Sequence, residues 1–201
     1  EIKKNAASDF QTLGLIFDGD GDRIAAVDEN GTYCNTQLIM PLLIDHLARV
    51  RNLPGAIVKT VSGSDLMRFI AQDLGREVIE MPVGFKFIAK EMLSRDVLIG
   101  GEESGGIGFG FHIPERDALY AALFLLEAIV EGGRPLGERI RSLQKRFGFS
   151  HFERIDLTLK DLSEREKFET FLTNSPPSSI GNKSVKEVIS IDGIKLRLAQ
   201  S

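Results

Sequence analysis

The sequence predicts a layered α/β fold, with a mixed or largely parallel sheet and flanking helices, followed by a partial α+β region. Between residues 56 and 131, short apolar runs of strand length alternate with stretches whose apolar residues recur at helical spacing. Elements that alternate in this way usually form a sheet covered by crossover helices. After Gly132-Gly133 the order changes, because a helix is followed there by candidate strands joined by polar turns.

The first expected elements are two short strands, at residues 13–17 and 24–28, the second closed by the turn residues Glu29-Asn30-Gly31. A helix is predicted at 36–51, where Pro41 should kink the helix or displace its start. The alternating elements then begin. They are, in order, a strand at 56–60, a helix at 65–74 ended by Gly75, a strand at 77–81, a helix at 85–93 and a strand at 97–99.

Residues 100–110 contain six glycines and are predicted to be a loop. A long helix is then expected from Pro114, a residue suited to the first helical turn, to Glu131. The remaining elements are less regular. They are a helix at 135–146, a strand at 151–160, a helix to Leu172 with Ser163 and Glu166 as a capping box, a polar loop at 174–183, and a hairpin of residues 187–191 and 194–198 around Asp192-Gly193.

Composition limits the class of protein. The chain has 201 residues and a net charge of −4, and its lysines and arginines are scattered, so we expect no nucleic-acid partner. The single cysteine, Cys34, excludes an internal disulfide and a cysteine zinc site, which fits a cytoplasmic protein. The longest apolar stretch contains Glu127 and is too short to span a bilayer, and we find no signal peptide. We therefore expect no membrane partner.

Three carboxylates, Asp18, Asp20 and Asp22, follow the first strand at alternate positions, separated by glycines and closed by Arg23. Glycine allows the backbone to curl so that the carboxylates converge. Convergent carboxylates repel one another unless a cation lies among them, and their hard oxygen atoms suit Mg²⁺ or Ca²⁺. The forked guanidinium of Arg23 is suited to a phosphate that the metal also contacts.

Two other interpretations of the aspartates remain open. Asp18, Asp20, Asp22 and Glu29 occupy positions one, three, five and twelve of an EF-hand calcium loop, although Arg23 stands where that loop needs glycine. This pattern would make the chain a noncatalytic calcium-binding module. An apolar strand before Asp-x-Asp is also similar to haloacid-dehalogenase phosphatases, in which the first aspartate is the nucleophile. Those enzymes normally carry Thr or Val where this chain has Asp22.

The glycine-rich segment carries Glu102, Glu103 and Ser104, and it lacks the Gly-Lys-Ser/Thr of a phosphate-binding Walker loop. Carboxylates and a hydroxyl on such a loop could accept hydrogen bonds from sugar hydroxyls, or could simply be solvated. Lys86 is either a solvated helix residue or an acid/base group that faces the turn with Asp18, Asp20 and Asp22.

The other candidates lie near the start of the long helix or are histidines. Arg116 could anchor an anion, whereas Asp117 is more simply explained as a residue that favours a helix N-terminus. His112 clusters with these two residues. His46 and His151 look like ordinary partly buried or surface histidines.

Three motifs in order resemble the α-D-phosphohexomutases, the family of phosphoglucomutase and phosphomannomutase. They are Phe17-Asp-Gly-Asp-Gly-Asp-Arg23, Gly101-Glu-Glu-Ser-Gly-Gly106 and His112-Ile-Pro-Glu-Arg-Asp117. The resemblance implies an enzyme that interconverts hexose 1-phosphate and hexose 6-phosphate, with hexose 1,6-bisphosphate as intermediate or activator. It also implies a phosphoserine, Mg²⁺ and hexose phosphate substrates.

The same resemblance assigns roles to individual residues. Asp18, Asp20 and Asp22 would bind Mg²⁺, and Arg23 would aid phosphate transfer. Glu102 and Ser104, with Arg116, would bind substrate. Val83-Gly-Phe-Lys-Phe87 is similar to the Thr-Gly-Trp-Lys-Phe stretch of glucose-type members, which implies an acid/base role for Lys86. Phe85 stands where mannose/glucose-type enzymes often have histidine, which favours glucose over mannose.

Two family motifs do not occur in this sequence: the Ser-His-Asn-Pro loop that carries the phosphoserine and the Arg-x-Ser-Gly-Thr phosphate clamp. We therefore expect a fragment that is inactive alone and that partners the missing domains of a longer parent chain. The expected domains are 1–34, the end of domain 2 with the metal loop; 35–147, the sugar-binding domain 3; and 148–201, part of domain 4.

Overall fold

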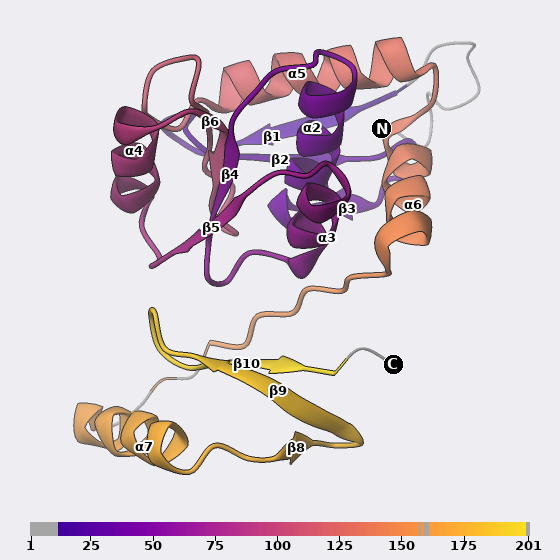
Figure 1. Cartoon of the computed structure of the whole chain (residues 1–201). Helices are drawn as coiled ribbons and strands as arrows, with labels where there is room; N and C mark the ends of the chain where they lie inside the picture. Colours follow the sequence, from indigo (N-terminus) through magenta and orange to yellow (C-terminus); the bar gives the residue numbers. More distant parts are fainter. Residues whose placement is uncertain (1–11, 157, 159–160, 200–201) are drawn as a thin grey trace. The chain divides into compact units, whose positions relative to one another are not determined.

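The computed structural model describes residues 12–156, 158 and 161–199. These residues form two compact units, unit 1 up to Phe152 and unit 2 from Glu153 onward. Unit 1 contains two sheets and the helices that cover the larger one, and unit 2 contains one helix and a small sheet (Figure 1). All of the candidate site residues lie in unit 1.

The larger sheet of unit 1 has the strand order β5-β4-β6-β7. Its strands are β4 (Ala56–Thr60), β5 (Val78–Met81), β6 (Val97–Gly101) and β7 (Ile107–Phe109). β4 runs parallel to both β5 and β6, whereas β7 is antiparallel to β6. The predicted mixed, largely parallel sheet is therefore confirmed.

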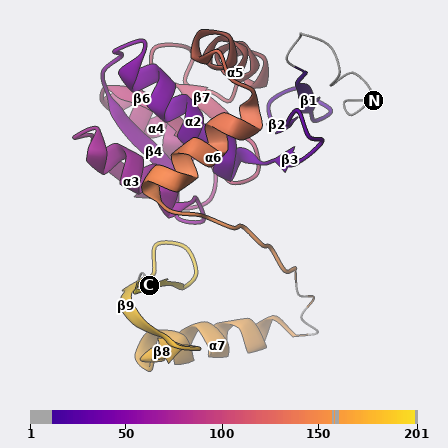
Figure 2. The same ribbon diagram turned by 90° about the vertical axis from the view of Figure 1, so that its right-hand side faces the viewer.

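Helices cover both faces of this sheet. α4 (Phe85–Ser94) packs Phe85 and Ile88 against Val58 on one face. The main core lies on the other face, where Figure 2 shows α2 (Thr36–Arg49), α3 (Asp65–Asp73) and α6 (Leu136–Phe147), and it includes the almost wholly buried α2. The helices that contribute to it are these three and α5 (Ala118–Gly132).

The second sheet of unit 1 is small and antiparallel, with the order β1-β2-β3. It consists of β1 (Gly14–Phe17), β2 (Ile24–Val27) and β3 (Tyr33–Cys34). The predicted strands at 13–17 and 24–28 are thus confirmed, and they pair with each other as a hairpin. The turn of this hairpin, residues 18–23, carries Asp18, Asp20 and Asp22 and is called the aspartate loop below.

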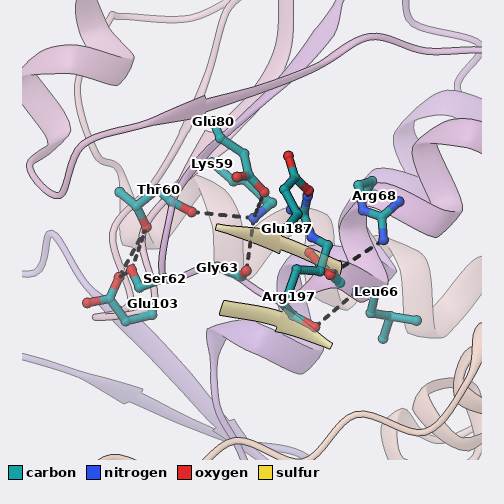
Figure 3. Close-up of polar contacts among 12 residues, drawn as sticks. Lys59, Thr60, Ser62, Gly63, Leu66, Arg68, Glu80, Glu103, Glu187 and Arg197 are labelled. Atoms are coloured by element: carbon teal, nitrogen blue, oxygen red, sulfur yellow. Dashed lines mark hydrogen bonds and ion pairs between the residues drawn. The ribbon is translucent and has the colours of Figure 1, made fainter. Parts of the chain in front are cut away.

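Unit 2 contains α7 (Leu162–Asn174) and an antiparallel sheet of β8 (Ser179–Ile180), β9 (Lys183–Ile189) and β10 (Lys195–Leu198). The predicted C-terminal hairpin is confirmed as β9 and β10. The Arg197 guanidinium forms an ion pair with the Glu187 carboxylate opposite it on these two strands (Figure 3).

Several boundaries differ from the sequence predictions in unit 1. The long helix begins at Ala118, because the Asp117 side chain caps it by accepting a hydrogen bond from the Tyr120 backbone N–H at 2.8 Å, so Pro114 lies before the helix. The predicted loop at 100–110 contains the end of β6 and all of β7. Pro41 lies inside α2 and does not displace the start of that helix.

Two predictions near unit 2 are also wrong. Residues 151–156 and 158 are not a strand, and the rest of that predicted element lies outside the described residues. Asp161, and not Ser163, caps α7, because its side chain accepts a hydrogen bond from the Ser163 backbone N–H at 2.9 Å. The polar loop at 174–183 includes the short strand β8.

Candidate active site

The aspartate loop is the connection between β1 and β2. Phe17 and Ile24 pair across the hairpin, and residues 18–23 form the turn between them. Gly21 has a φ of +72°, a left-handed conformation that favours glycine. The alternation of glycine and aspartate therefore lets a short turn carry three carboxylates on one side.

The three carboxylates converge. Asp18, Asp20 and Asp22 each offer an oxygen atom, and these atoms lie within 4.8 Å of one another. The Asp22 Oδ1 atom is buried and accepts no hydrogen bond. Converging oxygen atoms, one of them buried without a hydrogen bond although Arg23 Nε lies 3.5 Å from it, fit a hard divalent cation such as Mg²⁺.

Asp18 is held more firmly than the other two. Its Oδ1 atom accepts hydrogen bonds from the backbone N–H groups of Asp22 at 3.2 Å and Arg23 at 3.1 Å, and its Oδ2 atom lies 2.5 Å from Arg23 Nε. Loss of hydration is the largest single influence on the pKa of Asp18 and would raise it, but the hydrogen bonds and charge of Arg23 together lower the pKa to about 2.

Asp22 shows the opposite shift. Loss of hydration raises the pKa of Asp22, the charge of Arg116 opposes that rise, and the charges of Asp20 and Asp18 add to it. Loss of hydration and the neighbouring carboxylates thus both disfavour the charged form of Asp22, which a bound cation would favour.

The structure does not favour the calcium-loop interpretation. The Glu29 carboxylate, which would complete an EF-hand, accepts a hydrogen bond from the Gly137 backbone N–H at 2.9 Å and lies 3.4 Å from Arg141 Nη2. Both of these partners belong to α6. In addition, the aspartates lie in a β-hairpin, whereas an EF-hand loop joins two helices.

The second loop joins β6 to β7 and carries Glu102, Glu103 and Ser104. Glu102 is only 6% exposed, and its Oε1 atom accepts a hydrogen bond from the Gly84 backbone N–H at 3.1 Å. Burial is the main cause that raises the pKa of Glu102; the charge of Arg116 opposes it and that of Glu103 adds to it. Ser104 is exposed at the tip of the loop.

Glu103, which the sequence left as either an acceptor for sugar hydroxyls or a solvated carboxylate, attaches the loop to the end of β4. Its Oε2 atom accepts a hydrogen bond from Thr60 Oγ1 at 3.1 Å and another from Ser62 Oγ (Figure 3). These contacts hold the backbone between Glu102 and Ser104. Only the fold brings residues 60 and 103 together, so no local sequence signal could have revealed the contact.

The two loops lie side by side. The Ile24 backbone N–H donates to the Gly105 carbonyl at 3.1 Å, and Arg23 and Gly106 form an isolated antiparallel bridge. Arg116 Nη2 lies 2.6 Å from Asp22 Oδ2, and Arg116 Nη1 lies 3.8 Å from Glu102 Oε2. A cavity of about 270 Å³ lies here, and its lining includes Asp18, Arg23, Glu103 and Ser104.

The remaining candidates are placed as follows. Lys86 is exposed on the first turn of α4, two residues after Gly84, with its Nζ atom 5.0 Å from the centroid of the Phe87 ring. Asp117 caps α5, as the simpler interpretation held, and its Oδ2 atom lies 3.0 Å from His112 Nε2. His112 and Asp117 thus stabilise the approach to α5.

His46 is fully buried, whereas the sequence suggested a partly buried or surface residue. Its Nε2 atom lies 2.8 Å from Glu127 Oε1 and 3.9 Å from Glu131 Oε2, so these residues form a second possible cation group. The buried Nδ1 atom has no hydrogen-bond partner. A metal on Nε2 would move the ring proton to Nδ1, where no acceptor lies, so we interpret the contact as structural.

Glu102→Gln is expected to make stability less dependent on pH. Because the folded pKa of Glu102 is raised, its contribution to stability is complete below its ordinary pKa and is lost as pH rises through the folded pKa. Glutamine stays neutral and avoids that loss. Urea unfolding at about pH 4 and about pH 7 should therefore show a smaller decline in the free energy of unfolding than in the parent chain. Glu138→Gln on α6 is the control; an unchanged decline for Glu102→Gln would contradict the expectation.

The fold and the site together define a class of protein: an α/β domain that presents a loop with three converging aspartates beside a carboxylate-bearing, glycine-rich loop. A sequence model of phosphoglucomutase/phosphomannomutase, alpha/beta/alpha domain III, matches residues 35–147. The chain therefore belongs to the phosphoglucomutase/phosphomannomutase family.

Individual relatives agree with this assignment. Phosphoglucosamine mutase of Nitratidesulfovibrio vulgaris strain DP4 is 35% identical over 133 residues, covering 66% of this chain and 30% of that protein. Phosphoglucomutase/phosphomannomutase of Thermococcus kodakarensis is 33% identical over 149 residues, covering 74% and 32%. The chain thus spans about a third of the length of these curated relatives.

Solved structures show the same fold. A phosphoglucomutase/phosphomannomutase family protein of Burkholderia thailandensis superposes with a TM-score of 0.77 at 22% identity, over 97% of this chain and 39% of that one. An N-acetylphosphoglucosamine mutase of Aspergillus fumigatus, solved with GlcNAc-6P and magnesium, gives a TM-score of 0.51 at 18% identity, over 68% and 36%.

Proposed function

We propose that this chain supplies the metal loop and the sugar-binding loop of a hexose phosphate mutase, which interconverts hexose 1-phosphate and hexose 6-phosphate. The contacts between the two loops support this proposal. The Ile24 backbone N–H donates to the Gly105 carbonyl, and Arg116 contacts both Asp22 and Glu102. A metal loop beside hydroxyl-binding carboxylates suits a phosphorylated sugar.

Each site residue has a proposed part in this reaction. Asp18, Asp20 and Asp22 would hold Mg²⁺, which when bound supplies positive charge to the transferring phosphoryl group. Arg23 would bind the same phosphoryl group. Lys86 would exchange a proton with a sugar hydroxyl.

Substrate binding is proposed for three further residues. Glu102 and Ser104 would accept hydrogen bonds from sugar hydroxyls, and Arg116 would bind an anionic group of the ligand. For the sugar itself we propose glucose in preference to mannose, because Phe85 replaces the histidine often found in mannose/glucose-type members. The Phe85 side chain is only 6% exposed, so this preference would arise from the missing histidine and not from a contact made by Phe85.

We further propose that residues 1–34, 35–147 and 148–201 belong to domains 2, 3 and 4 of a longer cytoplasmic protein, which uses a phosphoserine and hexose 1,6-bisphosphate. Among the described residues no helix is long and apolar enough to cross a membrane. Since the chain holds no Ser-His-Asn-Pro loop, we expect no mutase turnover from the 201 residues alone.

Ligand binding tests this proposal on the chain itself. Glucose 1,6-bisphosphate should bind more tightly with Mg²⁺ than without it, and more tightly than inorganic phosphate does. Glu102→Gln should remove the advantage of the sugar over phosphate, because the loop then loses a charged acceptor for hydroxyl groups. Equal affinity for the bisphosphate and for inorganic phosphate would contradict a sugar site.

A second experiment separates the mutase from an aspartyl phosphatase. Both Asp18 oxygen atoms already accept hydrogen bonds, which suits a fixed metal ligand and not an attacking nucleophile. Beryllofluoride should therefore form no adduct on Asp18, and glucose 6-phosphate should not be hydrolysed. An adduct seen by fluorine NMR that Asp18→Asn removes would establish the phosphatase instead.

A further inference from the structure

Arg116 links the two functional loops. It precedes α5, and its guanidinium lies 2.6 Å from Asp22 Oδ2 through Nη2 and 3.8 Å from Glu102 Oε2 through Nη1. The side chain is 30% exposed and lies over the Phe85 ring, with 5.8 Å between the guanidinium carbon and the ring centroid. Gly106 leaves the space for it, since a Cβ atom at that position would overlap the Arg116 side chain.

The contact with Asp22 places a protein cation on a carboxylate that a divalent cation also needs. Arg23, in the same turn, pairs with Asp18 at 2.5 Å and also lies 3.5 Å from Asp22 Oδ1, whereas Asp20 is exposed. Arg116, in contrast, lies far from the aspartate loop in the sequence, just before α5. Two cations on one carboxylate repel each other, so close binding of one weakens binding of the other.

We propose that Arg116 and the divalent cation compete for Asp22, so that metal binding releases Arg116 to bind an anionic ligand beside Glu102. The proposal rests on the proposed function, because it assumes that the aspartate loop is the metal site. It makes Arg116 a ligand-binding residue that couples the metal site to the ligand site.

The coupling has a defined sign. An anion that binds Arg116 draws it away from Asp22 and frees that carboxylate for the metal, while the metal frees Arg116 for the anion. Linkage requires that each ligand raise the affinity for the other by the same factor. Loss of the guanidinium should therefore tighten metal binding in the absence of an anion and abolish the effect of an anion on the metal.

The experiment is calorimetric titration with Mg²⁺ alone and with Mg²⁺ in the presence of sulfate, a tetrahedral anion that stands in for phosphate. Arg116→Gln is expected to bind Mg²⁺ several-fold more tightly than the parent chain, whereas Arg116→Lys, which keeps the charge, should stay close to it. Arg95→Gln is the matched control, because it removes one positive charge at a site where Arg95 pairs with Glu77 and Glu91. Sulfate should strengthen Mg²⁺ binding in the parent chain and in Arg95→Gln, but not in Arg116→Gln.

The outcomes separate this inference from the function on which it rests. Mg²⁺ binding that is equal or weaker in Arg116→Gln would overturn the competition between Arg116 and the metal, while leaving the metal site in place. An equal tightening in Arg95→Gln would also overturn it, by showing a general effect of net charge. If neither the parent chain nor Arg116→Gln bound Mg²⁺, the metal site itself would be wrong.

Discussion

Asp20→Asn is expected to abolish measurable Mg²⁺ binding by the aspartate loop without unfolding the chain. Asp20 is exposed, so its loss removes a metal ligand at little cost to the fold. Changes to the outer partners of metal ligands already lower affinity by about 10- to 100-fold, so loss of a direct ligand should lower it by more than about 100-fold. Calorimetry and thermal unfolding of the same samples would measure both quantities.

Asp156→Asn provides the control for this prediction. Asp156 is also exposed, it pairs with Arg154, and it is far along the chain from the loop, so its replacement changes the net charge by the same amount. Mg²⁺ binding should survive in this variant. Binding that persisted in Asp20→Asn, or that fell equally in both variants, would contradict a specific site in the loop.

Lys59→Met is expected to lower the free energy of unfolding by about 3–5 kcal/mol, the usual cost of removing one partner of a buried ion pair. Lys59 is fully buried, its Nζ atom lies 2.8 Å from Glu80 Oε1, and it donates a hydrogen bond to the Gly63 carbonyl at 2.9 Å (Figure 3). Methionine replaces most of the volume but leaves the Glu80 carboxylate without its ammonium partner. Because Glu80 is 14% exposed, solvent screening favours the lower end of this range.

A double variant shows whether the lost charge pair is the cause. Lys59 and Glu80 face each other on neighbouring parallel strands, so Lys59→Met with Glu80→Leu replaces the pair by two apolar side chains. Such replacements are often neutral, and the double variant should recover most of the stability lost in Lys59→Met. A double variant as unstable as the sum of its single changes would contradict this account of Lys59.

Local sequence patterns predicted most of the α/β unit because its elements depend on nearby residues. β4 matches the predicted strand at 56–60 at both ends, since its apolar run is bounded by turn residues. The start of α5 was misplaced because Asp117, as the capping residue, determines it, whereas Pro114 only permits a helix. β7 was missed because Ile107, Gly108 and Phe109 carry too few side chains to show a strand pattern, and pairing with β6 defines them.

The candidate site was predictable as a set of residues but not as an arrangement. The spacing of Asp18, Asp20 and Asp22 was enough to predict that their carboxylates converge, because all three lie in one short turn. The contact between Arg116 and Asp22 joins residues that are distant in the chain, and only the tertiary fold creates it. The full burial of Lys59 and His46 could likewise not be predicted, because each side chain pairs with a residue on another element.

The proposed mutase function requires the aspartate loop to bind Mg²⁺ as part of one site with the glycine-rich loop. The most direct test is a Mg²⁺ titration of the isotope-labelled chain followed by NMR at each backbone amide. We expect saturable shifts at residues 18–23 and at Gly105 and Gly106, because the hydrogen bond to Ile24 and the bridge to Arg23 connect these two glycines to the aspartate loop. Shifts confined to His46, Glu127 and Glu131, or spread evenly over exposed acidic residues, would contradict it.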